Sequence, residues 1–527
     1  MKNTRNRPML ALAAAGFALA LIASSGGAQN ARQTTLVYGG DFEALSLDPG
    51  VGYDFTSLMV DSNAYETLVR FEGKDLAKLR PGLASSWKVS STADGTKMTF
   101  KLRAAKFASG RPVTANDVVY SLERVIAMKA APSFLITDIG GVKPGGVKAI
   151  DAKTVEINVP KTTSAQAFLS VLAFSVGSIV DSEEVKSHVK GDDYGSDWLK
   201  DHSAGSGPFV LTSWERSSQI TLEKNPNSSQ RRAKLSRVVL KDIKEADAQR
   251  IALESGEIDI ADSFTPEMFK AAASNPKMVA YKADSLLLEY LGMNSGPNSP
   301  FADARVRQAV RYAIDQDGII NDLLGGLARK TQTIIPFGLV GANPATPYKV
   351  DIEKAKALLK AAGKENGFEF DLTVPQGSLV GCVVPCADIG AKLQSDFAKI
   401  GLKANVRVLA ITEMLKLYRA SQLQMILFPW IPDFPDSDGN GTPFSNTLGT
   451  RNAWKSAEAA KLAELASLET NTSKRTALYK QLTEYHLENG WSAILYQAYQ
   501  PVVLSEAVQG FDRNALSVVQ LEKISKK

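Results

Sequence analysis

Short segments in which apolar and polar residues alternate recur along this chain, and helix-like patterns lie between them. Residues 98–102 and 155–159 alternate in this way, which is typical of half-buried strands. Thr114 and Asp117 form a capping-box-like start to a helix whose apolar residues begin at Val118. Interleaved strands and helices predict an α/β fold and exclude an all-helical or an all-β protein.

The length and charge of the chain limit its possible functions. At roughly 150 residues per domain, the 527 residues provide for about three domains. There are 61 basic and 56 acidic side chains, and removal of a segment containing Lys2, Arg5 and Arg7 leaves 58 basic ones and a net charge of +2. Such a small excess argues against a nucleic-acid partner, because nucleic-acid-binding proteins concentrate Lys and Arg on one face.

Residues 1–28 have the pattern of a secretory signal peptide. Basic residues precede an apolar stretch over 9–23, which is about 15 residues long and shorter than the ~20 that a helix needs to cross a bilayer. Gly26 and Ala28 are small, as a cleavage site requires, so we expect cleavage after Ala28. A short buried helix is the alternative. Because no cysteine lies nearby to carry a lipid anchor, we expect a soluble, periplasmic protein.

The two cysteines, Cys382 and Cys386, are close together in the sequence. In an oxidising compartment their spacing favours a disulfide that closes a small loop, and a pair of buried thiols is the alternative. The three histidines, His188, His202 and His486, lie far from the cysteines, so we expect neither a metal site nor another cofactor.

Several short motifs follow one another along the whole mature chain. They are LDP at 47–49, PGLASSW at 81–87, DGT at 94–96, FKLR at 100–103, TANDV at 114–118, GSGPF at 205–209 and FADARVRQA at 301–309. Each motif taken alone is explained by a helix cap, a tight turn or a surface helix. The series in this order resembles the extracytoplasmic solute-binding proteins of family 5, which serve peptide and nickel ABC importers and include the dipeptide- and oligopeptide-binding proteins.

The resemblance implies a bilobed periplasmic-binding-protein fold of type II with an additional inserted domain and a ligand cleft between the lobes. Lobe I would comprise residues 29–64, 206–290 and 492–527, and the inserted domain residues 65–205. Lobe II would comprise residues 291–491, with the hinge at the two places where the chain crosses between the lobes.

The same resemblance implies the substrate-binding component of an ABC importer. Such a protein captures a small peptide or peptide-like solute in the periplasm and delivers it to the inner-membrane permease, and we expect a monomer. A binder of nickel chelates or opines in the same family is one alternative, and a sensory protein without a transport role is another. An enzyme is not expected, since the sequence has no G-x-S-x-G, H-E-x-x-H or P-loop motif.

The segment FPWIPDFPD at 428–436 resembles the W-x-x-D-(Y/F) loop of the family. In peptide-binding members the aspartate of this loop pairs with the α-ammonium of the ligand, and Asp433 aligns with it. The neighbouring backbone forms a strand-like ladder with the peptide. Proline has no N–H, so the ladder would use the carbonyl of Pro429 and the N–H and carbonyl of Ile431.

The segment also has a purely structural interpretation. In a proline-rich turn, Asp433 and Asp436 would bind local backbone N–H groups. Trp430 would pack either on the ligand or in the core.

One departure from the family concerns the ligand's carboxylate. Dipeptide-binding members hold it with an arginine in a loop that corresponds to residues 376–379, whereas this chain has no Arg or Lys between Lys364 and Lys392. Arg451 and Lys455 are the candidates to replace it. Otherwise the ligand is not a plain dipeptide.

Overall fold

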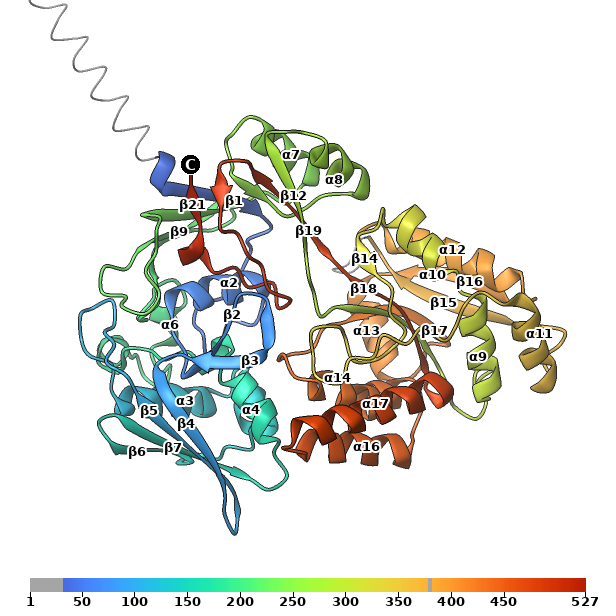
Figure 1. Cartoon of the computed structure of the whole chain (residues 1–527), viewed down its shortest axis with the longest axis horizontal. Helices are drawn as coiled ribbons and strands as arrows, with labels where there is room; N and C mark the ends of the chain where they lie inside the picture. Colours follow the sequence, from blue (N-terminus) through green and yellow to red (C-terminus); the bar gives the residue numbers. More distant parts are fainter. Residues whose placement is uncertain (1–31, 378–381) are drawn as a thin grey trace, which may run out of the picture.

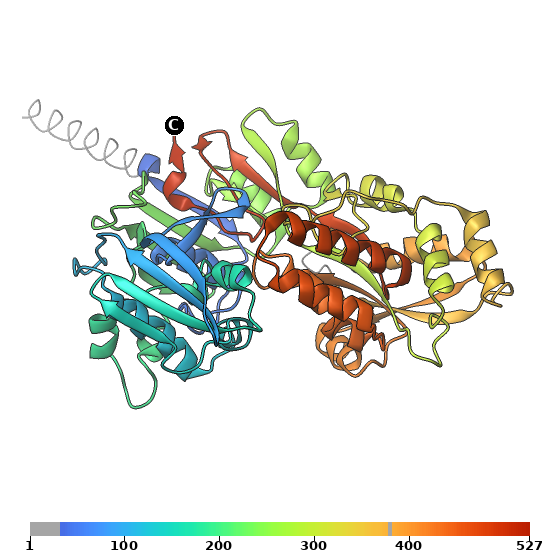
Figure 2. The same ribbon diagram turned by 60° about the horizontal axis from the view of Figure 1, so that its bottom comes forward.

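The computed structural model describes residues 32–377 and 382–527, and the predicted signal peptide lies outside them. The chain forms two bodies joined by strands that run between them (Figure 1). We call the body with the N-terminal strands the first body and the other the second body. Figure 2 shows the same arrangement from another direction.

The first body is built on a seven-stranded sheet. In spatial order its strands are β12 (Met278–Ala283), β19 (Gln500–Ser505), β11 (Ile260–Ala261), β1 (Thr35–Gly40), β10 (Arg237–Asp242), β9 (Gln219–Lys224) and β8 (Phe209–Glu215). Leu36 and Tyr38 of β1 pack in one cluster with Met59 of α2 (Phe55–Ala64). Val37 packs on the opposite face, against α7 (Ala246–Glu254) and α8 (Pro266–Ala273).

A four-stranded antiparallel sheet completes the first body. In spatial order its strands are β4 (Ala84–Ser91), β5 (Gly95–Leu102), β7 (Thr154–Pro160) and β6 (Val147–Asp151). Helix α3 (Ala115–Met128) begins with a capping box between Thr114 and Asp117. The strands predicted at 98–102 and 155–159 and the predicted helix start are therefore confirmed. The hairpin of β2 (Val69–Glu72) and β3 (Asp75–Pro81) and helix α4 (Ala165–Val171) also belong to this part.

The second body is built on a six-stranded mixed sheet. In spatial order its strands are β14 (Ala328–Arg329), β18 (Ser492–Ala498), β13 (Leu288–Met293), β17 (Met425–Trp430), β15 (Glu369–Pro375) and β16 (Lys403–Leu409). One core cluster includes helices α9 (Ala304–Ala313), α11 (Ile352–Ala361) and α12 (Cys386–Ala398). The other includes helices α13 (Ile411–Arg419), α14 (Asp438–Ser445), α16 (Ala457–Leu468) and α17 (Thr472–Asn489).

The chain passes between the two sheets at two places. One lies between β12 and β13, and the other lies between β18 and β19, where a single residue separates the two strands. Residues 492–498 form β18 of the second body's sheet, whereas the residues from Gln500 return to the first body. The domain limits given above for the two lobes and the inserted domain stay a prediction.

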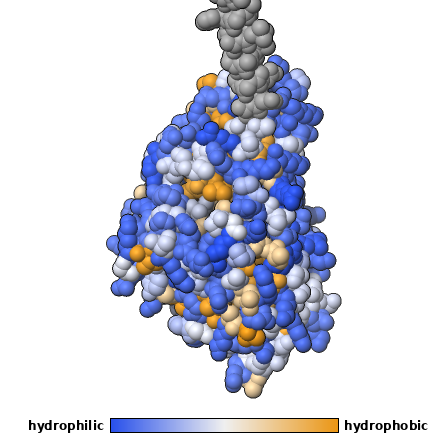
Figure 3. Space-filling view, turned by 90° about the vertical axis from the view of Figure 1, so that its left-hand side faces the viewer, coloured by the Kyte–Doolittle hydropathy of each residue, from blue (hydrophilic) through white to orange (hydrophobic). Residues whose placement is uncertain are grey.

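The surface of the first body is mostly hydrophilic on the face shown in Figure 3, with hydrophobic side chains scattered between polar ones. Within 32–377 and 382–527, no helix is long and apolar enough to cross a membrane.

Candidate functional site

The predicted ligand loop leaves the C-terminal end of a central strand. β17 pairs with antiparallel β13 over its whole length, with Pro429 opposite Glu289. In the described parts of the chain, its pairing with parallel β15 is confined to Met425 and Ile426. Ligands of open α/β sheets bind beyond the carboxyl ends of the strands. The loop over 431–437 therefore occupies a position that suits a ligand site.

Asp433 connects the second body to the first. The hydroxyl of Tyr53 donates a hydrogen bond to Oδ1 of Asp433 over 2.6 Å. Tyr53 stands directly before the capping residue of α2, and its ring meets the edge of Phe134 with a centroid distance of 6.1 Å. The approach to α2 in the first body and the loop of the second body thus meet at this carboxylate.

The environment of Asp433 favours a cationic partner. Burial raises the pKa of Asp433 above its ordinary value, and the hydrogen bond from Tyr53 opposes that rise. The carboxylate is half-buried, and a buried negative charge is stabilised by a positive group at hydrogen-bonding distance. A ligand ammonium would supply that group.

Asp436 has a different role, although it belongs to the same loop. It is buried, and its two oxygens accept hydrogen bonds from Arg475 over 2.9 and 2.5 Å. One of these oxygens also accepts the backbone N–H of Asp438. Because Arg475 is itself buried and also donates to the carbonyl of Ala466, Asp436 fixes the loop to α17. The bond from the N–H of Asp438 matches the structural interpretation given above, whereas the sequence did not predict the pair with Arg475.

Trp430 and Ile431 lie at the start of the loop. The indole N–H of Trp430 donates to the carbonyl of Gly439 over 3.0 Å, and both side chains pack partly buried against the core. The indole therefore braces the loop against α14. The predicted ligand contacts of Pro429, Trp430 and Ile431 stay predictions.

The two cations proposed for a ligand carboxylate are Arg451 and Lys455. Arg451 is the last residue of α15 (Thr447–Arg451), and its guanidinium lies over the ring of Tyr418 at 5.7 Å. Lys455 is exposed. Throughout the described parts of the chain, no hydrogen bond or ion pair joins either side chain to Asp433. Their role toward a ligand carboxylate stays a prediction.

Cys382 and Cys386 are joined by a disulfide with a Cα–Cα distance of 5.5 Å. Both are buried in the core on the α12 face of the sheet, and the N–H of Cys386 donates to the carbonyl of Gly377 over 3.0 Å. The bridge ties the connection after β15 to the start of α12. Ser378 and Leu379, which belong to the predicted carboxylate-binding loop, lie outside the described residues.

Two cavities lie between the bodies, and the first borders the ligand loop. The first, of about 390 Å³, is bordered by β3, β4 and α4 on one side and by Pro435, Asp436 and Ser437 on the other. The second, of about 640 Å³, is bordered by Asp138 on one side and by Asp438 on the other. The loop thus borders open space between the bodies.

The sequence analysis did not identify Tyr53 or Asp438. The signal for Tyr53 is its position shortly after the LDP motif, which marks the approach to α2. Burial raises the pKa of Asp438 to about 6, and this carboxylate accepts a hydrogen bond from Thr442. Neither residue belongs to a motif that suggests a function.

Within the described ranges, no group of three or more His, Cys, Asp and Glu side chains is placed to hold a metal ion. His188 and His202 both stack on the indole of Trp198, with centroid distances of 4.2 and 4.9 Å. His486 is buried, which lowers its pKa to about 3.

Comparison with known proteins identifies the family. Residues 78–452 match the model of the bacterial extracellular solute-binding proteins, family 5, middle region. The chain belongs to this family. The predicted family is thus confirmed, and with it the role of a solute-binding protein.

The relatives and solved structures that match this chain cover nearly its whole length. The probable D,D-dipeptide-binding periplasmic protein DdpA of Escherichia coli (strain K12) is 29% identical over 501 residues, 91% of this chain and 92% of the relative. Heme-binding protein A of Haemophilus influenzae is 27% identical over 513 residues, 92% of this chain and 91% of the relative. Among solved structures, the periplasmic binding protein DppA of Helicobacter pylori in complex with the peptide STSA has a TM-score of 0.75 and 25% identity, covering 95% of this chain and 99% of that one. HbpA2 of Haemophilus parasuis has a TM-score of 0.82 and 25% identity, covering 94% and 100%. The predicted bilobed periplasmic-binding-protein fold is confirmed.

Proposed function

We propose that this family 5 protein captures peptides in the periplasm and delivers them to the permease of an ABC importer. Two observations support the peptide ligand: the named ligands of the relative from Escherichia coli and of the solved protein from Helicobacter pylori are peptides. The mature chain would act as a monomer that closes around its ligand by movement at the two crossings between the bodies.

The carboxylate of Asp433 is the observation that carries this proposal. It lies beyond the end of β17, in a loop whose Pro435 and Ser437 border a cavity between the bodies, and it has Tyr53 of the first body as its partner. A ligand ammonium bound here would touch both bodies, so that ligand binding would favour their closure. One fixed charge at the start of the ligand suits peptides, because every free peptide carries that ammonium.

The strand next to Asp433 offers the other half of a peptide site. Beyond Ile426, β17 continues to Trp430 without a described pairing to β15. An extended peptide added along this stretch would make main-chain hydrogen bonds that do not depend on its side chains. The carbonyl of Pro429 and the N–H and carbonyl of Ile431 are the groups assigned to this role.

Calorimetric titration of the mature chain with paired peptides tests the proposal. The pairs are Ala-Ala and Ala-Ala-Ala, each with a free and with an acetylated N-terminus, and D-Ala-D-Ala extends the set. We expect at least one free peptide to bind and its acetylated form to bind at least about 100-fold more weakly, since the carboxylate of Asp433 then lacks its cation. Equal binding of both forms would overturn the assignment of Asp433. Failure of a wide set of free peptides would overturn peptide capture.

The alternative ligands give different results in native mass spectrometry of the protein purified without refolding. A retained mass of peptide size supports the proposal. A retained mass that matches a metal chelate, an opine or a haem would mean that the protein binds that ligand and not a peptide. A protein that retains nothing and binds none of these classes would support the sensory alternative.

A further inference from the structure

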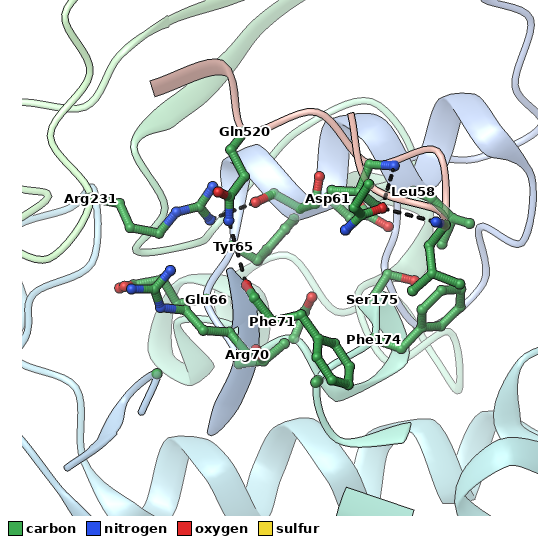
Figure 4. A pocket seen from close by; sticks show the side chains of 18 residues that line it. Leu58, Asp61, Tyr65, Glu66, Arg70, Phe71, Phe174, Ser175, Arg231 and Gln520 are labelled. Atoms are coloured by element: carbon green, nitrogen blue, oxygen red, sulfur yellow. Dashed lines mark hydrogen bonds between the residues drawn. The ribbon is translucent and has the colours of Figure 1, made fainter. Parts of the chain in front are cut away.

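A separate cavity of about 80 Å³ lies within the first body (Figure 4). Leu58 and Asp61 line it from one face of α2, and Tyr65 lines it directly after the end of that helix. Ser175 and residues of the segment 514–520 line the other sides. None of its described lining residues comes from the second body. The cavity is therefore distinct from the ligand loop.

The side chains of Asp61 and Ser175 are buried at this cavity, and neither has a hydrogen-bond partner among the described residues. Neither carboxylate oxygen of Asp61 has a partner among the described residues, although the side chain is fully buried. The hydroxyl oxygen of Ser175 also has none. Buried polar groups are nearly always hydrogen-bonded, and two exceptions that line one cavity indicate a polar or charged occupant.

The nearby arginines do not neutralise Asp61. Arg231 also lines the cavity, but it pairs with Glu522 over 2.8 Å. Arg70 pairs with Glu72 over 3.3 Å. Neither arginine therefore forms an ion pair with Asp61, and a charge on its carboxylate would have no described counter-ion.

Other acidic groups near Asp61 also favour a cation in this cavity. Burial raises the pKa of Asp61 well above its ordinary value, and the charges of Asp48 and Asp54 raise it further. Glu66 adds another carboxylate to the cavity wall, where it accepts a hydrogen bond from Ser206 over 2.8 Å. A bound positive charge would stabilise the ionised form of Asp61.

We propose that this cavity binds a small, weakly hydrated monovalent cation, a potassium or ammonium ion, through the carboxylate of Asp61 and the hydroxyl of Ser175. One carboxylate without a described counter-ion matches one positive charge. The rings of Phe71 and Phe174 line the walls, and aromatic faces attract cations but cannot replace the water shell that Mg²⁺ retains. The site does not depend on Asp433 or on the ligand of the cleft.

Thermal unfolding of the mature chain in matched salts tests this site. The buffers have equal ionic strength and contain KCl, NH₄Cl, NaCl or choline chloride, whose cation is too large for the cavity. A ligand that binds only the folded state raises the melting temperature, and we expect a saturable rise of about 1–3 °C in KCl or NH₄Cl over choline chloride. Equal unfolding in all the salts would overturn the proposal. An equal rise in NaCl would overturn the assignment to a weakly hydrated ion.

Three variants locate the response. Asp61→Asn keeps the shape of the side chain and removes its charge, so the difference between the salts should disappear. Asp433→Asn changes the cleft alone and should keep the full difference. Ser175→Ala removes one oxygen and should weaken the response, and it provides the test if Asp61→Asn does not fold. A response in both Asp61→Asn and Ser175→Ala that equals that of the unmodified chain would overturn the site.

Discussion

The loop that follows β17 carries two aspartates, Asp433 and Asp436, in different surroundings. Asp436 is buried and receives two hydrogen bonds from Arg475 of its own body. Asp433 is half-buried, and its described partner is the hydroxyl of Tyr53 from the other body. The same residue type thus anchors the loop at one position and, in the proposed site, would bind a ligand at the other. The proposed difference in role rests on the partner of each carboxylate and not on its place in a motif.

Removal of Asp436 should have the largest effect on stability. Asp436→Ala leaves the guanidinium of Arg475 buried without its partner, and breaking such a pair costs about 3–5 kcal/mol. We expect this loss in the free energy of unfolding measured with urea.

Glu353→Ala provides the matched control for Asp436→Ala, because Glu353 is exposed in its ion pair with Lys356. Its stability should be close to that of the unmodified chain. A stability of Asp436→Ala equal to that of the control would mean that the Arg475 pair does not hold the loop.

Removal of Asp433 should lower the peptide affinity and leave the free energy of unfolding almost unchanged. Asp433→Ala deprives a bound ammonium of its carboxylate, a loss of about 2–5 kcal/mol in binding free energy. The stability without peptide should change little, since only one described hydrogen bond, from Tyr53, is lost. Calorimetric titration and urea unfolding of the same preparation check both parts. Unchanged affinity would remove Asp433 from the site.

The sequence predicted local features well because their determinants lie close together. The capping box of Thr114 and Asp117 depends on residues that are close together in the sequence, and so does the loop after β17. The partners of the two loop aspartates are far away in the chain: Arg475 is 39 residues from Asp436 and Tyr53 is 380 residues from Asp433. Periodicity and motifs carry no information on such pairs, since they form only when distant elements pack. The proposal that one aspartate is structural and the other binds the ligand therefore rests on the fold.

A third carboxylate of this region, Asp438, should make stability depend on pH. Burial raises its pKa to about 6, above the value of about 4 expected for an unfolded aspartate. The folded chain therefore holds this proton more tightly, and the contribution of Asp438 to stability falls as the pH rises from about 4 to about 6. Asp438→Asn keeps an oxygen for the hydroxyl of Thr442 and loses no proton.

We expect Asp438→Asn to be more stable than the unmodified chain at pH 7.5 by about 1–2 kcal/mol and to lose this advantage near pH 4. Urea unfolding of both proteins across this range measures the difference. A constant difference between them would show that Asp438 does not hold a proton in the folded chain.

The smallest expected effect concerns the hydroxyl of Tyr53, which joins Asp433 to the other body. Its hydrogen bond lowers the pKa of Asp433 against the effect of burial, and such a bond contributes about 0.5–1.5 kcal/mol. Tyr53→Phe should therefore raise the pH below which peptide affinity is lost by about half a unit to one unit, because an ammonium binds the ionised carboxylate. Affinity measured from pH 4 to pH 8 tests this shift, with Tyr194→Phe as the control at an exposed tyrosine. If both variants and the unmodified chain lose affinity at the same pH, the contact between the bodies has no influence on the charge of Asp433.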